Sequence, residues 1–197
     1  MAQELPQMPE ETKELSYTTA EEMPQAIKDL IYKEWLPRIM AGALKAVRQL
    51  PSEHRDRVLK EMGAACAGLN TPVVGITPGM GLEEYKKHLS ALQPPLGPRT
   101  IEQVGDIVQV SYHSPIGKDG RPICQCPLIQ LKMVEPFPEL CACAANNGAC
   151  WIETAIGKPC AKAELMGSPL ATGEPYCRYT VYLEPPLSST PRGRKTS

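Results

Sequence analysis

The sequence predicts an α+β fold, in which an N-terminal helical region packs with a small antiparallel sheet and one prominent helix in the C-terminal half. Before residue 93, apolar residues recur at three- and four-residue intervals, which is the spacing of one helix face. After residue 99, short segments rich in β-branched residues are separated by glycine-containing turns, which is typical of strands. A proline-rich connection, QPPLGPRT, lies between the two regions.

Residues 21–93 are expected to form the helical region. The first helix carries its apolar residues between Ile27 and Val47, and Pro37 is expected to split or kink it. The second helix begins near Ser52, which can cap it, and is expected to end at residues 68–70. The glycine- and proline-containing stretch TPVVGITPGMG then indicates a loop, and a short helix follows at 82–92.

Residues 99–185 are expected to form a cysteine-rich α+β domain. Strands are predicted at 106–112, 159–165 and 176–183, and a helix at 141–156 that stops at Gly157. In the last strand two sets of residues alternate, so one face can be buried: Tyr176, Arg178, Thr180 and Tyr182 on one side, and Cys177, Tyr179, Val181 and Leu183 on the other. Residues 1–20 are predicted to be a flexible lead-in, and residues 186–197 a disordered tail.

The composition narrows the compartment and the partners. Basic and acidic residues number 21 and 22, so there is no electrostatic reason to expect nucleic acid as a partner. No apolar run is long enough for a membrane span, and the acidic N-terminus does not resemble a secretory signal. We therefore expect a cytoplasmic protein with reduced thiols and no membrane partner. Seven of its eight cysteines lie between Cys124 and Cys177, which favours metal binding or catalysis.

Two matching dithiols are the strongest chemical feature: Cys124-Gln-Cys126 and Cys141-Ala-Cys143. Thiolates are soft ligands that suit zinc or iron–sulfur clusters. Zinc ribbons, however, usually place two residues between paired cysteines, and buried inert thiols explain the pattern as well. The predicted metal-binding set, with zinc as the expected cofactor, is Cys124, Cys126, Cys141, Cys143, Glu164 and Cys177.

Other residues are candidates for catalysis or for ligand binding. A nucleophilic cysteine, Cys143 or Cys126, would need a base such as Glu153, Glu164 or His113. Polar and aromatic side chains on the predicted 141–156 helix are the candidates for contacts with a small-molecule ligand: Asn146, Asn147 and Trp151.

In the C-terminal quarter of the chain, helix, strand and turn signals follow one another in an order that is similar to that of known protein families. A helix that begins with cysteine is followed by Gly157, a strand with Glu164, a turn with Gly173 and the segment Cys177-Arg-Tyr-Thr-Val. This order resembles vinyl-reductase-like small-molecule-binding domains, which are relatives of TRAPP transport-complex subunits and of phenol-responsive sensor domains. It is also similar to aminothiazoline-carboxylate hydrolase-like proteins. With the upstream Cys66, the dithiols look like those of bacterial proteins of this type that have no assigned activity.

The resemblance implies a zinc site. In the sensor members a helix cysteine, a strand glutamate, a cysteine shortly after it and a cysteine that opens the last strand hold the metal. Here Cys141 or Cys143 matches the first ligand, Glu164 the second and Cys177 the last. Gly167 occupies the third position, so Cys124, Cys126 or Cys160 would have to replace the missing ligand.

The leading prediction is a small-molecule-binding or sensor-type domain with a cysteine-lined site that can bind zinc. The first alternative is a hydrolase of a small cyclic or amide substrate that uses a cysteine nucleophile. The second alternative is a structural protein that forms a homodimer through its helices.

Overall fold

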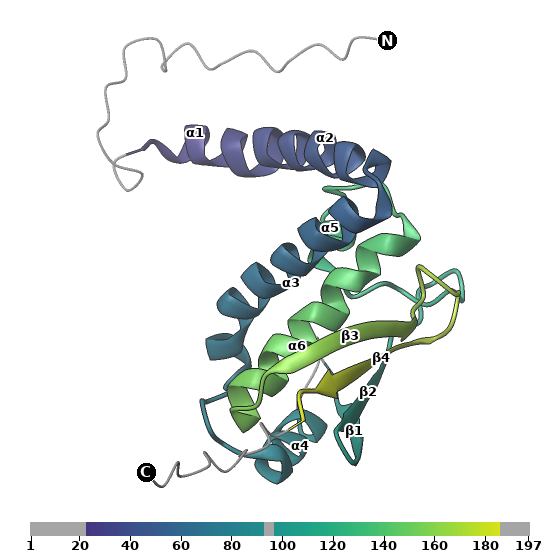
Figure 1. Ribbon diagram of the computed structural model, residues 1–197. Helices are drawn as coiled ribbons and strands as arrows, with labels where there is room; N and C mark the ends of the chain where they lie inside the picture. The colour runs from purple at the N-terminus through teal and green to yellow at the C-terminus, as the bar shows by residue number, and fades with distance from the viewer. Residues whose placement is uncertain (1–22, 93–96, 186–197) are drawn as a thin grey trace, which may run out of the picture.

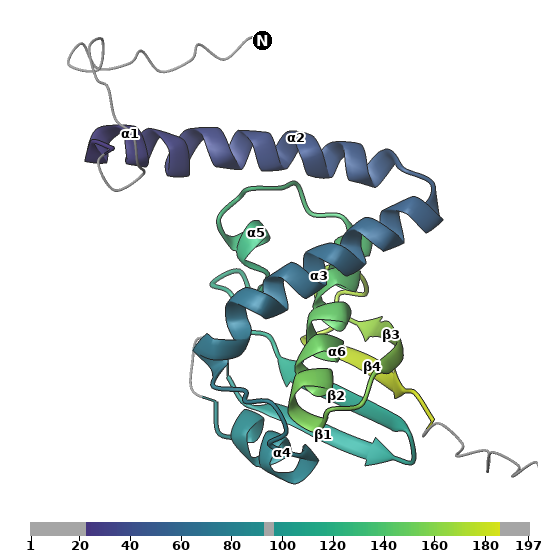
Figure 2. The same cartoon turned by 60° about the vertical axis from the view of Figure 1, so that its left-hand side comes forward.

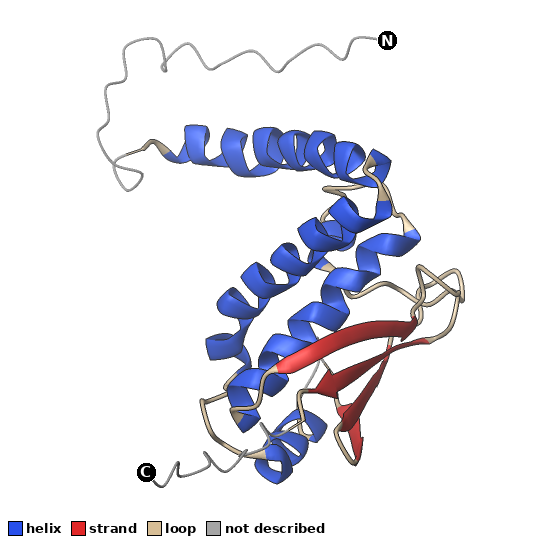
Figure 3. Cartoon of the chain, viewed as in Figure 1, coloured by secondary structure: helices blue, strands red, loops and turns tan. Residues whose placement is uncertain are grey.

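One antiparallel sheet and the helices on one of its faces make up the fold, which confirms the predicted α+β class (Figure 3). The computed structural model describes residues 23–92 and 97–185. Its four strands lie in the order β1-β2-β4-β3, and every neighbouring pair is antiparallel. Their bounds are Arg99–Val104 for β1, Ile107–His113 for β2, Cys160–Gly167 for β3 and Tyr176–Leu183 for β4.

Three layers are stacked in the body of the molecule (Figure 1). Helix α6, Ala142–Ile156, lies on the sheet, and helix α3, Ser52–Val74, lies on the outer side of α6. Helix α4, Leu82–Ser90, packs beside β1 and α6. The opposite face of the sheet is open to solvent and carries polar side chains such as Gln109 and Arg178.

Two hydrophobic core clusters join the helical region to the cysteine-rich region, and the larger one lies between the helices and the sheet. Val74 and Tyr85 from the helical region share it with Ile152 of α6 and Val181 of β4. The predicted buried face of β4 is confirmed, since Cys177, Tyr179, Val181 and Leu183 are all buried.

Two glycines allow the helices and the sheet to approach closely. A Cβ atom on Gly63 of α3 would lie 2.6 Å from the Cys143 carbonyl oxygen of α6. A Cβ on Gly148 of α6 would lie 2.2 Å from the Tyr179 hydroxyl of β4. Any larger residue would push the layers apart, so Gly63 allows α3 to lie close to the start of α6, and Gly148 allows the middle of α6 to lie close to β4.

The N-terminal helices form an arm across one end of the body (Figure 2). Helix α1, Gln25–Leu30, continues through a π-helical turn, η2, at Ile31–Trp35 into α2, Leu36–Gln49. Pro37 was expected to split or kink the helix, but the chain stays helical because the π turn directly before it accommodates the missing N–H group.

Helix α3 extends past residues 68–70, where the sequence predicted its end. The last turn contains Pro72, and the helix stops at Gly75, whose φ of 79° is left-handed. The Gly75 and Ile76 N–H groups donate to the Pro72 and Thr71 carbonyls, as in a Schellman motif. The predicted loop at TPVVG is therefore wrong, because this cap satisfies the helix end beyond the proline.

Strand β1 is the element that the sequence does not predict. It carries mostly polar residues, and it is ordered by its register with β2, in which Arg99 lies opposite Tyr112. Two short helices, α5 at Pro127–Gln130 and the 3₁₀ turn η3 at Pro138–Cys141, lead the chain into α6. The predicted lead-in and tail lie outside the described residues. None of the described helices combines the length and the apolar character that crossing a membrane requires.

Candidate functional site

Six of the eight cysteines line one cavity of about 230 Å³, which we call the thiol cavity. They come from α3, from the loop before α5, from the start of α6 and from the start of β4: Cys66, Cys124, Cys126, Cys141, Cys143 and Cys177. Both dithiols and Cys177 therefore line the same cavity, and Cys66, which is isolated in the sequence, joins them.

The loop that carries Cys124 and Cys126 is tied to the sheet by hydrogen bonds. Gln125 Nε2 donates to the His113 carbonyl over 3.1 Å, and the Ile123 N–H donates to the Pro115 carbonyl over 2.8 Å. Gln130 Nε2 of α5 donates to the Cys124 carbonyl over 3.3 Å. These contacts hold the first dithiol over the end of β2 and beside α6.

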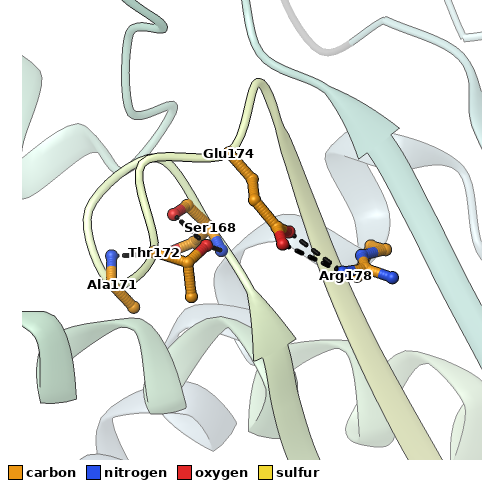
Figure 4. Close-up of polar contacts among 5 residues, drawn as sticks. All are labelled: Ser168, Ala171, Thr172, Glu174 and Arg178. Atoms are coloured by element: carbon orange, nitrogen blue, oxygen red, sulfur yellow. Dashed lines mark hydrogen bonds and ion pairs between the residues drawn. The ribbon is translucent and has the colours of Figure 1, made fainter.

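The β3–β4 connection holds a hydroxyl group against Cys141. Ser168 Oγ donates to the Cys141 sulfur over 3.2 Å and accepts from the Ala171 N–H over 2.9 Å. Figure 4 shows the network that fixes this connection, in which the Ser168 N–H donates to Thr172 Oγ1 over 3.2 Å.

The same connection is closed on its outer side by an ion pair. Glu174 accepts two hydrogen bonds from Arg178, at 3.0 and 3.1 Å (Figure 4). A Cβ on Gly167 would lie 2.1 Å from the Glu174 carboxylate, so glycine at this position leaves room for the pair. Gly167 stands at the position of the missing family ligand, and the space needed by the Glu174–Arg178 pair explains why glycine fits there.

Cys124 and Cys141 interact directly. The neighbouring Cys141 thiol has the largest effect on the pKa of Cys124, and with the Cys126 backbone N–H it lowers that pKa to about 6 against the opposing effect of burial. The pKa of Cys141 is raised for the same reason, since it keeps the shared proton, and burial adds to the effect. The two shifts have opposite directions, which favours Cys124 over Cys141 as the thiol that ionises first.

Burial has the opposite effect on the cysteines that the sequence suggested as nucleophiles. It raises the pKa of the Cys143 thiol to about 12, with neighbouring Cys126 and Cys66 adding to the shift. It also raises the pKa of Cys126. Neither forms a thiolate readily, so Cys124 replaces them as the nucleophile candidate.

A buried arginine on β1 also lines the cavity. Arg99 has only 7% of its surface exposed, and its guanidinium carbon lies 4.4 Å from the Tyr112 ring centroid and 5.3 Å from that of Trp151. Its Nε and Nη1 atoms are buried and make no hydrogen bond. Among the described residues no carboxylate forms an ion pair with it.

Two of the predicted ligand-binding residues reach the same cavity with unused donors. Asn147 and Trp151 both line it, and Asn147 Nδ2 and Trp151 Nε1 are buried without a hydrogen-bond partner. Unsatisfied buried donors are rare in folded proteins. Together with Arg99, they make a cavity wall that offers hydrogen-bond donors to an acceptor.

Two other predicted residues, Glu164 and His113, lie elsewhere. Glu164 pairs with Lys162 and accepts a hydrogen bond of 2.9 Å from the Tyr182 hydroxyl. His113 stacks edge-on against Tyr176, with 6.1 Å between ring centroids. Neither lines the thiol cavity.

The remaining candidate residues line a separate groove between α3, α6 and β3. Asn146, Cys150, Glu153 and Cys160 line it. Glu153 Oε1 accepts the Cys160 N–H over 2.7 Å, which joins α6 to β3. Asn146 Nδ2 donates to the Ala142 carbonyl over 2.9 Å. Glu153 and Asn146 therefore have structural partners, and the groove keeps them apart from the six cavity thiols.

The predicted zinc site requires cavity donors of the right kind that are also grouped closely enough to hold one ion. Six thiols are chemically suited to zinc. Within residues 23–92 and 97–185, however, no three Cys, His, Asp or Glu side chains are grouped so that they could hold a metal ion. The donors fit the metal in kind but not in arrangement, so we derive no chemistry through it.

No protein-family model matches the chain, and no curated protein matches it. The resemblance to small-molecule-binding and hydrolase-like domains therefore stays a prediction. The geometry of the thiol cavity is what carries the functional interpretation.

The sequence assigns no role to three residues of the site: Arg99, Tyr112 and Ser168. Arg99 lies on a strand without apolar alternation, and only its pairing with Tyr112 turns it toward the core. Ser168 follows Gly167 in a predicted turn. Arg99 is a charged residue near the end of the proline-rich connection, so the local sequence does not indicate that it is buried.

Proposed function

We propose that the protein is a small-molecule-binding domain whose thiol cavity takes a small organic anion. The observation that carries the proposal is Arg99, a buried guanidinium with two unpartnered N–H groups at the wall of a thiol-lined cavity.

A buried charge of this kind is costly unless it is paired. Moving an isolated charged group out of water costs several kcal/mol, even after the protein relaxes. The cation–π contacts with the rings of Tyr112 and Trp151 offset part of this desolvation cost, by about 1–2 kcal/mol each. An anionic ligand would supply the missing partner, and a planar carboxylate matches the fork of a guanidinium.

The other lining groups support an acceptor-rich ligand of limited size. Asn147 Nδ2 and Trp151 Nε1 add two donors without partners. Ligand pockets for drug-sized molecules measure roughly 300–1,000 Å³, so a cavity of about 230 Å³ suits something smaller. Apolar side chains such as Leu140 and Leu165 complete the lining and would contact the body of the ligand.

The proposal is tested with two alkylating reagents that differ only in charge. Iodoacetate carries a carboxylate and iodoacetamide is its neutral counterpart. If Arg99 attracts anions, the iodoacetate-to-iodoacetamide rate ratio at Cys124 should exceed the ratio at Cys150, outside the cavity, by about tenfold. Rates are read for each cysteine by peptide mass spectrometry, relative to the unfolded chain.

Two variants complete this test. Arg99→Met should bring the ratio at Cys124 down to that at Cys150. Arg48→Met removes an exposed arginine from α2 and should leave the ratio unchanged. Equal ratios at Cys124 and Cys150 in the native protein would contradict the proposal.

Zinc binding is tested separately by metal analysis of protein purified without chelator. One zinc for each chain, released when cavity cysteines are replaced, would support a zinc-bearing form of the site. Retention of that zinc in Glu164→Gln is expected, because Glu164 is engaged by Lys162 and Tyr182 outside the cavity.

A hydrolase is the second candidate, and Cys124 favours it because a thiolate is the nucleophilic form of cysteine. None of the side chains that line the thiol cavity, however, is Asp, Glu or His. A burst of p-nitrophenol from p-nitrophenyl acetate, lost in Cys124→Ser, would support acyl transfer to this residue.

Homodimer formation has support of a different kind. Large apolar side chains are exposed along the arm, among them Tyr32 at 65%, Trp35 at 50% and Ile39 at 63%. Light scattering tests for a dimer, and Ile39→Lys should weaken it if the arm is the interface.

A further inference from the structure

The thiol cavity has a buried end and a mouth that differ in chemistry. Arg99 and Trp151 line the cavity with only 7% and 3% of their surfaces exposed, so they lie at its buried end. Val73 and Pro127 also line it but are exposed, Val73 at 82%, so they lie at its mouth. A ligand that fills the cavity therefore places one end against a cation and the other against apolar side chains.

The mouth is apolar because of the way in which α3 ends. The helix continues past Pro72 to Val74, and this last turn carries Val73 to the cavity. Leu69, one turn earlier on the same face of the helix, is 77% exposed as well. Single exposed apolar residues are common on protein surfaces, whereas here two neighbours stand together beside the entrance to a cavity.

The walls between the two ends are also suited to an apolar chain. Three leucines line them: Leu140, Leu165 and Leu170. Cys141 and Cys177 of the lining are buried, and buried free cysteines pack like small apolar side chains. A hydrocarbon body would therefore contact apolar surface along the cavity.

Neutral polar side chains of the lining are engaged within the chain itself. Asn70 Nδ2 donates to the Cys66 sulfur over 3.1 Å. Gln125 donates to the His113 carbonyl, and Ser168 donates to the Cys141 sulfur. Polar groups spread along the body of a ligand would thus find few free partners.

Arg99 sets the charge of the ligand. None of the described residues that line the cavity adds a second cationic side chain. A single carboxylate would be neutralised by Arg99, whereas a di- or tricarboxylate would bury a charge without a partner, which is costly.

We propose that the thiol cavity binds an amphiphilic monocarboxylate, an acid with one carboxylate on a linear alkyl chain of medium length. The inference rests on the proposed function, because Arg99 would hold the carboxylate. The chain would run along the leucines and leave the cavity past Val73, so that its end lies against Leu69. Only the head and the inner part of the ligand then need to fit inside the cavity.

The test is isothermal titration calorimetry of the full chain with three straight-chain carboxylates below their critical micelle concentrations: butanoate, hexanoate and octanoate. Each methylene that becomes buried should tighten binding by about fourfold, which is the effect of removing one CH₂ group from water. Octanoate should therefore bind about a hundredfold more tightly than butanoate. The neutral 1-octanol, with the same chain length, should bind about tenfold more weakly than octanoate.

Two valine variants locate the chain at the mouth. Val73→Ser removes apolar surface there and should weaken octanoate by about three- to fivefold while it leaves butanoate unchanged. Val104→Ser is the matched control, because Val104 is 78% exposed on β1 and lies outside the cavity lining. It should change neither affinity. Since both side chains are exposed, neither substitution should disturb folding.

Arg99→Met tests the head group. It should lower the affinity for octanoate to that for 1-octanol and leave the preference for longer chains in place.

Each failure has its own meaning. Equal affinities for butanoate and octanoate, both weakened by Arg99→Met, would overturn the inference and support the anion site of the proposed function. Equal affinities for octanoate and 1-octanol in the native chain would contradict the anion site and, with it, the carboxylate head. Equal losses in Val73→Ser and Val104→Ser would overturn the position of the chain. If none of the three carboxylates binds, the inference is wrong, and the alkylation rates at Cys124 still decide the anion site.

Discussion

Cys124 should be alkylated with an unusual dependence on pH. With a pKa of about 6, roughly 90% of it is thiolate near pH 7, against about 3% for an ordinary cysteine with a pKa near 8.5. A low pKa also weakens the nucleophile, by about tenfold for a slope near 0.45, so the net advantage near pH 7 is only about two- to threefold. Near pH 6 the advantage grows to about tenfold, because the ordinary thiol is almost fully protonated.

The assay is the iodoacetamide rate at each cysteine, measured by peptide mass spectrometry between about pH 5 and pH 9. The rate at Cys124 should rise with a midpoint near pH 6. Cys141→Ala removes the donated hydrogen bond and should move the midpoint toward about 8.5. Cys141→Ser keeps an O–H donor and should restore much of the shift. A native midpoint above about pH 8, or a midpoint that Cys141→Ala leaves in place, would refute the reasoning.

Three further predictions concern stability. Arg99→Met removes an unpaired buried charge, so the free energy of unfolding should stay within about 1 kcal/mol of the native value or rise. A loss of about 3–5 kcal/mol in urea denaturation would instead indicate that the substitution broke an ion pair. Under reducing conditions the native chain should be less stable near pH 9.5 than near pH 7. The raised pKa values of Cys141, Cys143 and Cys177 keep these thiols protonated in the folded state, whereas the same thiols ionise above about pH 8.5 in the unfolded state, and this difference costs about 1.4 kcal/mol per pH unit for each thiol. Unchanged midpoints of urea denaturation would contradict this prediction. Gly63→Ala should cost about 1–3 kcal/mol by overpacking α3 against α6, while Gly68→Ala on the same helix, with nothing within 4 Å, should gain up to about 1 kcal/mol; equal thermal shifts would show that the two helices are not in close contact.

Local patterns predicted those parts of the fold in which one chain segment carries its own signal. Helix α6 has a clear stop at Gly157 and strand β4 shows a clear alternation, and both elements lie within a residue or two of the expected bounds. The density of cysteines between Cys124 and Cys177 indicated where the chemistry lies, but not which of these thiols line the same cavity. Strand β1 and the last turn of α3 depend on contacts that a local pattern does not contain, namely the pairing with β2 and the Gly75 cap.

The candidate site shows the same division more sharply. Thiols are visible in a sequence because cysteine is rare, so their grouping was predicted, whereas their pKa values depend on neighbours from other elements. Cys141 and the Cys126 N–H lower the pKa of Cys124, whereas burial raises the pKa of Cys143. Arg99 is an ordinary polar residue in the sequence, and only the sheet register and the rings of Tyr112 and Trp151 make it a buried cation.

Crystals grown in bromide would test the central claim, that the thiol cavity holds an anion at Arg99. Bromide is a small anion whose position an anomalous difference map gives directly. The account predicts a bromide peak, or the density of a co-purified anion, inside the cavity against Nε and Nη1 of Arg99. A guanidinium paired with a carboxylate of the chain itself, with no anion in the cavity, would contradict it.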